Sequence, residues 1–191
     1  MLALAILTFA ACGPVEPPEF QFNAVEQLKQ ERLFLDEGET FPPSAREEVT
    51  SILRVLFGSP DQPRFPNPSS SVVDSERLDM AAGPVESDID GTPHGLYREH
   101  CAHCHGISGD GAGSTAALLS PYPRDFRMGK FKFKSTPLRT PPTDQDLTRI
   151  LHNGIPGSAM PSFRLLAEEE ITALVDYVKY LSMRGLSLIH I

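Results

Sequence analysis

Two cysteines and two histidines lie within the short sequence Cys-Ala-His-Cys-His, which begins at Cys101. Two thiols separated by two residues and followed at once by a histidine meet the needs of covalent haem attachment, because both thiols can add to the vinyl groups of one porphyrin and the imidazole can bind its iron. A thiol redox pair or half of a zinc site would use the same spacing, but zinc needs more ligands and the third cysteine, Cys12, lies far upstream. The pattern predicts one c-type haem, attached through Cys101 and Cys104 and bound by His105.

The second iron ligand is expected from a loop about fifty residues further along the chain. A haem that carries electrons without binding external molecules needs a sixth ligand, and a thioether on a rigid loop supplies one. Met160 lies in such a loop, because residues 154–163 are rich in glycine and proline. A single methionine is more often core filling than a ligand, and three others have no such loop around them: Met80, Met128 and Met183. We therefore expect Met160 to be the distal ligand.

Length and composition favour one domain with appendages or two small domains, because 191 residues with 40% apolar residues suffice for a globular core. The sequence has no apolar run of about twenty residues, which an ordinary transmembrane helix needs. The formal net charge of -8 is uneven: residues 1–91 hold 6 Lys and Arg against 16 Asp and Glu, whereas residues 92–191 hold 11 against 9. No basic stripe indicates nucleic-acid binding, and no motif indicates a small-molecule substrate.

Residues 1–12 are typical of an export signal. Met1 to Ala11 form an apolar stretch that is too short to span a bilayer, with small residues just before Cys12. The arrangement resembles a bacterial lipoprotein signal, although Phe9 replaces the usual leucine and no Lys or Arg precedes the apolar run. We expect an exported protein on the periplasmic side, anchored to the membrane by a lipid on Cys12. A plain cleaved signal and an uncleaved apolar anchor are the alternatives.

Residues 13–91 form an acidic extension that holds ten of the eighteen prolines. Because proline removes a backbone donor and fixes φ, most of this stretch is expected to be extended or irregular, and residues 59–71 to be a linker. One amphipathic helix is predicted at about 44–57, with a capping box formed by Ser44 and Glu47. Its apolar face consists of Val49, Ile52, Leu53, Leu56 and Phe57. We expect this face to pack on the chain's own haem domain rather than on a partner protein.

A haem domain is expected over residues 92–184. Thr92 and Pro93 predict the start of a helix that leads into the haem motif, and the glycines behind the motif allow the chain to turn tightly beside a flat cofactor. A loop over residues 121–139 mixes aromatic and basic side chains. The aromatic rings can cover the porphyrin, while the cations either neutralise haem propionates, meet an acidic partner or are solvated. The basic side chains are Arg124, Arg127, Lys130, Lys132, Lys134 and Arg139.

Two further helices are predicted in this domain. One is expected at about 143–153 with Thr143 as its cap, and the last from about Ala167 to Met183, with an apolar face that crosses the first helix near Tyr97. Residues 185–191 form an apolar tail after the last helix. Such a tail suits burial, continuation into a further segment, or foreign sequence at the end of a gene fragment.

Three stretches of this domain point together to a known family. Gly95-Leu-Tyr leads into the haem motif, Met160-Pro lies in its loop, and the terminal helix carries the sequence from Leu174 to Leu181. With these motifs, residues 92–184 resemble a class I mono-haem bacterial cytochrome c. Pro93 and Ala167 depart from the usual glycine and helix cap of that family, and the family says nothing about the extension.

The resemblance implies an all-α fold, a small helical cytochrome c built around one covalently bound haem c, here preceded by the Pro-rich extension with its one amphipathic helix. It also implies thioether bonds at Cys101 and Cys104, with His105 as the proximal and Met160 as the distal iron ligand.

Electron transfer is the function that these residues predict. With both axial positions filled by the protein, no coordination site is left for a substrate, and the chain has no second cofactor motif or catalytic triad. We therefore expect a carrier or electron-transfer subunit of a respiratory chain, not an enzyme, with redox proteins as donor and acceptor. The alternative is a haem enzyme or gas-sensing protein with a labile sixth ligand. A third interpretation is a structural haem subunit, tethered to a larger complex by the extension.

Overall fold

The computed structural model describes residues 17–38, 42, 44–66 and 72–190. The helices of this part are α1 (Ala24–Asp36), α2 (Ala45–Phe57), α3 (Ser75–Ala81), α4 (Leu96–His100), α5 (Ala102–His105), α6 (Asp144–Asn153) and α7 (Glu168–His190), with short 3-10 helices η1 (Ala116–Leu118) and η2 (Phe126–Met128). Strands β1 (Glu86–Ser87) and β2 (Pro93–His94) pair in antiparallel fashion. The all-α prediction is confirmed. Within the described residues, no helix has the length and apolar character that a membrane span requires.

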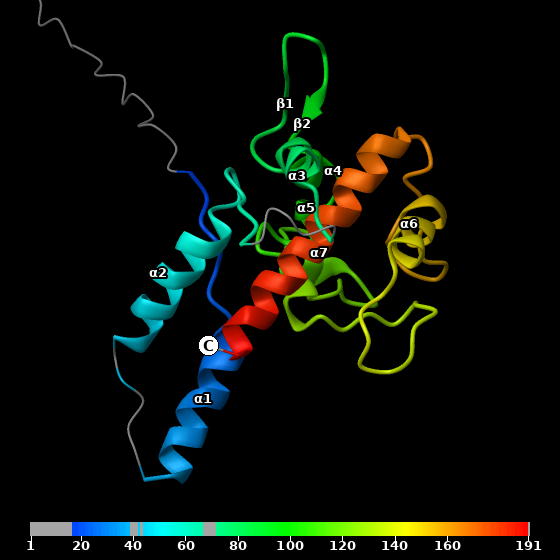
Figure 1. The fold of residues 1–191 in the computed structure, drawn as a ribbon. Helices are drawn as coiled ribbons and strands as arrows, with labels where there is room; N and C mark the ends of the chain where they lie inside the picture. The colour runs from blue at the N-terminus through cyan, green and yellow to red at the C-terminus, as the bar shows by residue number, and fades with distance from the viewer. Residues whose placement is uncertain (1–16, 39–41, 43, 67–71, 191) are drawn as a thin grey trace, which may run out of the picture.

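Helix α7 runs through the middle of the molecule, with α6 on one side and α2 on the other (Figure 1). Three acidic residues in its first turn favour helix formation at the positive end of the helix dipole. Ala167 cannot cap the helix with its side chain, but its backbone N–H donates to Glu170 Oε2 at 2.7 Å. This bond is one half of a capping box.

The helix continues to His190, so the prediction that it ends at Met183 with a separate tail behind it is wrong. Gly185 does not stop the helix. A Cβ at this glycine would lie 2.4 Å from the Cα and the carbonyl oxygen of Arg127, so the missing side chain lets η2 pack directly on α7. The neighbouring Leu186 reaches Gly129, just beyond η2.

The predicted helix at 44–57 is confirmed as α2, but its capping box is wrong. Ser44 already has helical φ and ψ angles of -73° and -20°, and its side chain makes no capping hydrogen bond. A capping residue needs non-helical angles so that its oxygen can face the free N–H groups. Leu53 and Phe57 are buried against the rest of the protein, whereas Ile52 and Leu56 of the same predicted face are exposed.

The extension contains more helix than expected, and several of its residues are buried against the haem domain. Helices α1 and α3 both begin with a side-chain cap, from Asn23 and Asp74. The prediction of a linker is wrong for residues 59–66, because Pro60 is fully buried and its carbonyl accepts hydrogen bonds from Gly83 N–H and the Tyr177 hydroxyl. Residues 67–71 lie outside the described residues.

The haem motif is approached by a strand rather than by the predicted helix start at Thr92 and Pro93. Pro93 belongs to β2, and the helix α4 begins only after Gly95. Gly95 has a φ of +72°, and a Cβ there would lie 2.2 Å from the carbonyl oxygen of Pro84. The hairpin therefore requires glycine at this turn. The expected crossing near Tyr97 is confirmed, since its ring centroid lies 4.8 Å from that of Tyr177 on α7.

Candidate functional site

A cavity of about 570 Å³, open to solvent, lies between α6, α7, η2 and the loops around Phe131 and Met160. Its walls are almost entirely apolar. The residues that line it are His105, Arg124, Phe126, Phe131, Lys132, Phe133, Leu147, Ile150, Leu151, Ile155, Met160, Val175 and Val178. Two side chains with iron-binding atoms, the predicted proximal and distal ligands, are thus brought to the same cavity from positions fifty-five residues apart in the sequence.

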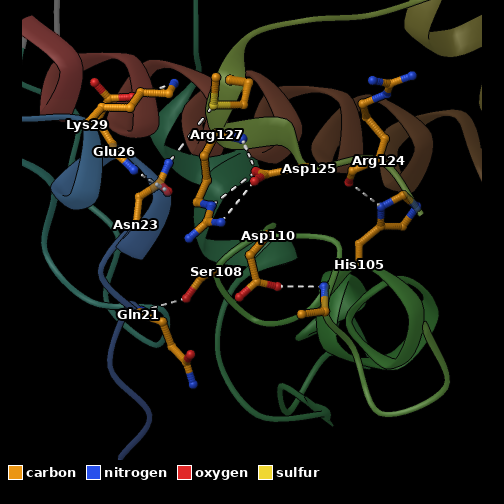
Figure 2. Close-up of polar contacts among 12 residues, drawn as sticks. Gln21, Asn23, Glu26, Lys29, His105, Ser108, Asp110, Arg124, Asp125 and Arg127 are labelled. Carbon is orange, nitrogen blue, oxygen red and sulfur yellow. Dashed lines mark hydrogen bonds and ion pairs between the residues drawn. The ribbon is translucent and has the colours of Figure 1, made fainter. Parts of the chain in front are cut away.

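His105 ends the helix α5 and is held from two directions. Its Nδ1 lies 3.0 Å from the carbonyl oxygen of Arg124 (Figure 2). Because a carbonyl can only accept, Nδ1 carries the proton, which leaves the lone pair of a neutral ring on Nε2. Burial lowers the pKa of the imidazole and so favours the neutral form that binds metals. The ring of Phe126 stacks on the imidazole with centroids 4.5 Å apart.

The loop behind the haem motif depends on glycine to approach α5 closely. A Cβ on Gly113 would lie 2.4 Å from the carbonyl oxygen of His103, so any larger residue would push the loop away from the motif. Gly109 accepts a 2.7 Å hydrogen bond from Phe126 N–H. The loop thereby fixes η2 beside His105.

The N-terminal extension also reaches this region. The backbone N–H of Gln21 donates to the buried Ser108 Oγ at 2.6 Å, three residues after His105 (Figure 2). Next to it, Asn23 is buried and its side chain caps α1 by accepting from Glu26 N–H. The extension therefore contacts the loop that follows the predicted proximal ligand.

The two cysteines of the motif lie at either end of the first turn of α5 and form no disulfide with each other. Cys101 is buried, and burial raises the pKa of its thiol to about 12. A reactive redox cysteine has the opposite property, a pKa lowered by its surroundings. Cys104 is half-buried, with its Sγ 3.4 Å from Thr115 Oγ1. Neither thiol is part of the cavity lining, although His105, the next residue, is.

The Met160 loop is closed by its own backbone. Ile155 N–H donates to the carbonyl of Met160 at 3.1 Å, and Met160 N–H donates to Ser158 Oγ at 3.2 Å. Gly154 turns the chain out of α6 with a φ of +65°, where a Cβ would lie 2.7 Å from the Met160 carbonyl oxygen. The thioether is therefore presented to the cavity by a short, internally bonded turn.

Of the six basic side chains in the loop over residues 121–139, the structure places two at the cavity, Arg124 and Lys132. Arg127 is paired with Asp125 at 2.9 Å. Lys134 donates to the carbonyl of Thr136, also at 2.9 Å. Sequence reasoning named the loop as a source of cations but did not distinguish these roles.

Two contributions to the site were missed from the sequence. One is the Arg124 carbonyl, since a backbone acceptor leaves no residue-type signal. The other is Asp146, a buried carboxylate on α6 that joins the helix to the loop around Phe131. The sequence predicted Thr143 as the cap of this helix, and the structure adds Asp146 as the other half of a capping box.

The residues present fit a haem group. The apolar cavity holds an imidazole and a thioether, the ligand pair of electron-transferring haem proteins. Two thiols lie within four residues of the imidazole in the sequence, and two basic residues, Arg124 and Lys132, are among those that line the cavity. Among the residues that the structure describes, no group of three or more His, Cys, Asp or Glu side chains is arranged to hold a metal ion.

This chain is similar to known proteins. The family described as cytochrome c oxidase, cbb3-type, subunit III matches residues 91–178. Cytochrome c55X of Paracoccus denitrificans (strain Pd 1222) is 31% identical over 101 residues, which cover 51% of this chain and 79% of the relative. Among solved structures, a chain of the reducing HAO-like protein complex of Kuenenia stuttgartiensis is 36% identical, with a TM-score of 0.44, over 50% of this chain and 43% of that chain. The match thus spans less than half of the Kuenenia chain. The present chain belongs to the mono-haem c-type cytochromes, which transfer electrons through a covalently bound haem c.

Proposed function

We propose that this cytochrome is an electron carrier or the electron-transfer subunit of a respiratory redox complex, and not an enzyme in its own right. Cys101 and Cys104 would hold the haem by thioether bonds, and His105 and Met160 would bind its iron. The observation that carries this proposal is that an imidazole with its lone pair on Nε2 and a loop-held thioether line one apolar cavity. The bound haem supplies a reversible one-electron change at iron.

The protein's own residues fix the ligands and exclude water. The hydrogen bond from His105 to the Arg124 carbonyl sets the tautomer and the ring orientation, as outer partners of metal-bound histidines do. Phe126, Leu151 and Val175 keep the cavity walls apolar. Arg124 and Lys132 are the basic residues that we propose to pair with haem propionates, because both contribute to the cavity lining.

A spectroscopic experiment tests the ligand assignment. The oxidised holoprotein should show the weak near-infrared band of sulfur bound to ferric iron, and Met160→Ala should abolish it, lower the reduction potential and open the iron to cyanide. Met183→Ala is the matched control, because Met183 is likewise partly buried against the core but does not line the cavity. It should leave the band unchanged.

Carbon monoxide separates the carrier from its alternative. Stable binding of carbon monoxide to the untreated reduced wild-type protein would support the haem enzyme or gas sensor with a labile sixth ligand. Absence of the near-infrared band in the wild type would remove Met160 from the assignment.

The cellular setting is also part of the proposal: an exported protein on the periplasmic side, anchored by a lipid at Cys12. The apolar stretch before Cys12 and the attachment of haem c support it; Cys12 itself lies outside the described residues. The expressed protein should partition into detergent, and Cys12→Ser should release it or block its processing. Mass spectrometry that finds an unmodified Cys12 in the mature protein would contradict the anchor.

Redox partners complete the proposal. We expect rapid reduction by a quinol-oxidising complex and rapid oxidation by a terminal oxidase. If basic side chains of the loop over residues 121–139 dock these partners, both rates should fall as salt is raised. Co-purification in a fixed stoichiometry, lost when residues 13–91 are deleted, would instead favour a permanent subunit.

A further inference from the structure

The most heavily bonded buried carboxylate near the cavity belongs to Asp146, in the first turn of α6. Its side chain is only 1% exposed. Asp146 Oδ2 accepts hydrogen bonds from Ser135 N–H at 2.9 Å, from Ser135 Oγ at 3.0 Å and from Thr143 N–H at 3.1 Å, and Oδ1 accepts from Arg149 at 2.7 Å. The bond to Thr143 caps the helix. The two bonds to Ser135 do not serve the helix, because Ser135 belongs to the preceding loop.

The part of this loop that precedes Ser135 forms one wall of the cavity. We call residues 131–133 the aromatic lid, because Phe131, Lys132 and Phe133 all line the cavity. The ring of Phe131 stacks on that of Phe126 with centroids 6.1 Å apart, and Phe126 in turn stacks on His105. The lid therefore continues a row of rings that starts at the proximal ligand.

The two ends of the lid are held in different ways. At its start, η2 is fixed to α7 and to the Gly109 carbonyl. At its end, Ser135 is exposed to solvent, and its bonds to Asp146 connect the lid to α6. Phe133 is 53% exposed, so apolar burial does little to hold this end closed. A buried carboxylate with two bonds to one residue is the stronger constraint, because hydrogen bonds to charged groups exceed neutral ones.

We propose that Asp146 is a positioning residue of the haem site, which holds the aromatic lid closed over the cavity by its two hydrogen bonds to Ser135. This inference rests on the proposed His105 and Met160 ligation. We call these two hydrogen bonds the clamp. When the clamp is intact, the lid limits the access of water and of external ligands to the haem. When it is lost, the lid opens locally at its Ser135 end while the iron ligands remain in place.

Two variants of the same capping box separate a clamp from a simple helix cap. In Asp146→Asn, an amide NH₂ group must face either the Ser135 donors or Arg149, so the clamp is weakened. In Thr143→Ala, the hydroxyl that accepts from Asp146 N–H is lost, but the carboxylate keeps its bonds to Ser135. Asp144→Asn serves as the charge control, since it lies on the same turn and pairs with Lys179 instead. Ser135→Ala removes one of the two clamp bonds and covers the case in which Asp146→Asn does not fold.

The holoprotein variants are compared by hydrogen exchange of the residue 135 amide, whose N–H donates to Asp146 Oδ2, and by the rate at which imidazole replaces Met160 on the oxidised haem. We expect Asp146→Asn to accelerate both by about threefold or more and Ser135→Ala by less, because local opening governs both processes. Thr143→Ala and Asp144→Asn should leave both rates near the wild-type value. Equal effects of Thr143→Ala and Asp146→Asn would show that Asp146 acts only as a helix cap, and the proposed clamp would be wrong. Unchanged exchange in Asp146→Asn would also overturn it.

The failure of this inference can be distinguished from failure of the proposed function. Hydrogen exchange reports the lid whatever binds the iron, whereas the near-infrared band of the wild type reports the Met160 ligand. A normal band with unchanged exchange in Asp146→Asn would reject the clamp alone.

Discussion

The two sides of α7 have different neighbours: one side faces the cavity, and the other is covered by the extension. Val175 and Val178 face the cavity of about 570 Å³. Tyr177 and Tyr180 lie two positions further along, about 200° around the helix, and both are buried under the extension. The Tyr177 hydroxyl donates to the Pro60 carbonyl and the Tyr180 hydroxyl to the Phe57 carbonyl. On one side the chain leaves space that haem c fills, whereas on the other side the chain fills the space itself.

This difference indicates what the extension does. Residues between Phe20 and Ala82, including Leu53 and Leu78, join the same apolar core as α7. Asp176 on α7 accepts from the backbone of Asp74 and pairs with Arg77 of α3. The extension therefore acts as a supporting layer for the haem domain. It is not a separate core, and changes in it should affect stability more than the spectrum.

Removal of the cofactor's attachment should have the largest effect. A Cys101→Ala, Cys104→Ala double variant cannot form either thioether, so haem staining after denaturing electrophoresis should disappear. Because the cavity side of α7 then loses its cofactor, the melting temperature should fall strongly as well. The single variants keep one attachment and should retain stain. Covalent haem in the double variant would contradict the assignment of the two cysteines.

A core substitution on the side of α7 that the extension covers should lower the stability of the protein without changing the haem. Leu53 is 1% exposed, so Leu53→Ala should lower the free energy of unfolding by about 2–5 kcal/mol through lost burial and a cavity. Val55, two residues away on α2, is 70% exposed. Val55→Ala should therefore change the free energy of unfolding by less than about 0.5 kcal/mol. Chemical denaturation measures both. A shifted near-infrared band in Leu53→Ala would show that the extension also tunes the iron.

The sequence was most informative where periodicity and capping residues agree. Thr143 caps α6 as predicted, and α2 has the predicted bounds within one residue. It was least informative in the extension, where proline was read as a sign of irregular, unpacked chain. Pro60 shows the reason for the failure: a proline has no N–H to satisfy, so it can be buried readily when its carbonyl finds donors elsewhere.

The candidate site likewise contains residues that the sequence predicted and supporting groups that it did not. Residue types and spacing named His105 and Met160, which the fold brings to one cavity. The supports of the site use groups that carry no such signal. One is the backbone carbonyl of Arg124, and another is a carboxylate that contacts Ser135 eleven residues earlier. Helix α3 did have a usable signal, since Asp74 is a typical N-cap and its side chain accepts from the next turn.

Low pH should lower the stability of the cavity side of the protein, because it protonates the Asp146 carboxylate. Hydrogen bonds from Ser135, the largest cause, and from Thr143 hold the pKa of this carboxyl well below its ordinary value of 3.8. A lowered folded-state pKa means that the stabilisation is complete above the unfolded-state pKa and is lost as the pH falls through about 4 towards the folded-state pKa. The stability difference between wild type and Asp146→Asn, measured by urea unfolding, should therefore shrink between pH 6 and pH 3. For Asp144→Asn the difference should change less, because Asp144 is 67% exposed.

The smallest effect is expected from the ion pair that joins the extension to α4. Arg98 pairs with Asp61, and their side chains are 27% and 23% exposed. Such a pair gains little over its two hydrated charges, so a double-mutant cycle with Arg98→Ala and Asp61→Ala should give a coupling energy of about 1 kcal/mol or less. Because solvent ions reach both groups, the coupling should fall further when salt is raised from about 0.1 M to about 1 M. The apolar contacts at Leu53 and Phe57 would then account for most of the attachment. A coupling above about 2 kcal/mol that resists salt would reverse this order, and the extension would be held to the haem domain by charge rather than by burial.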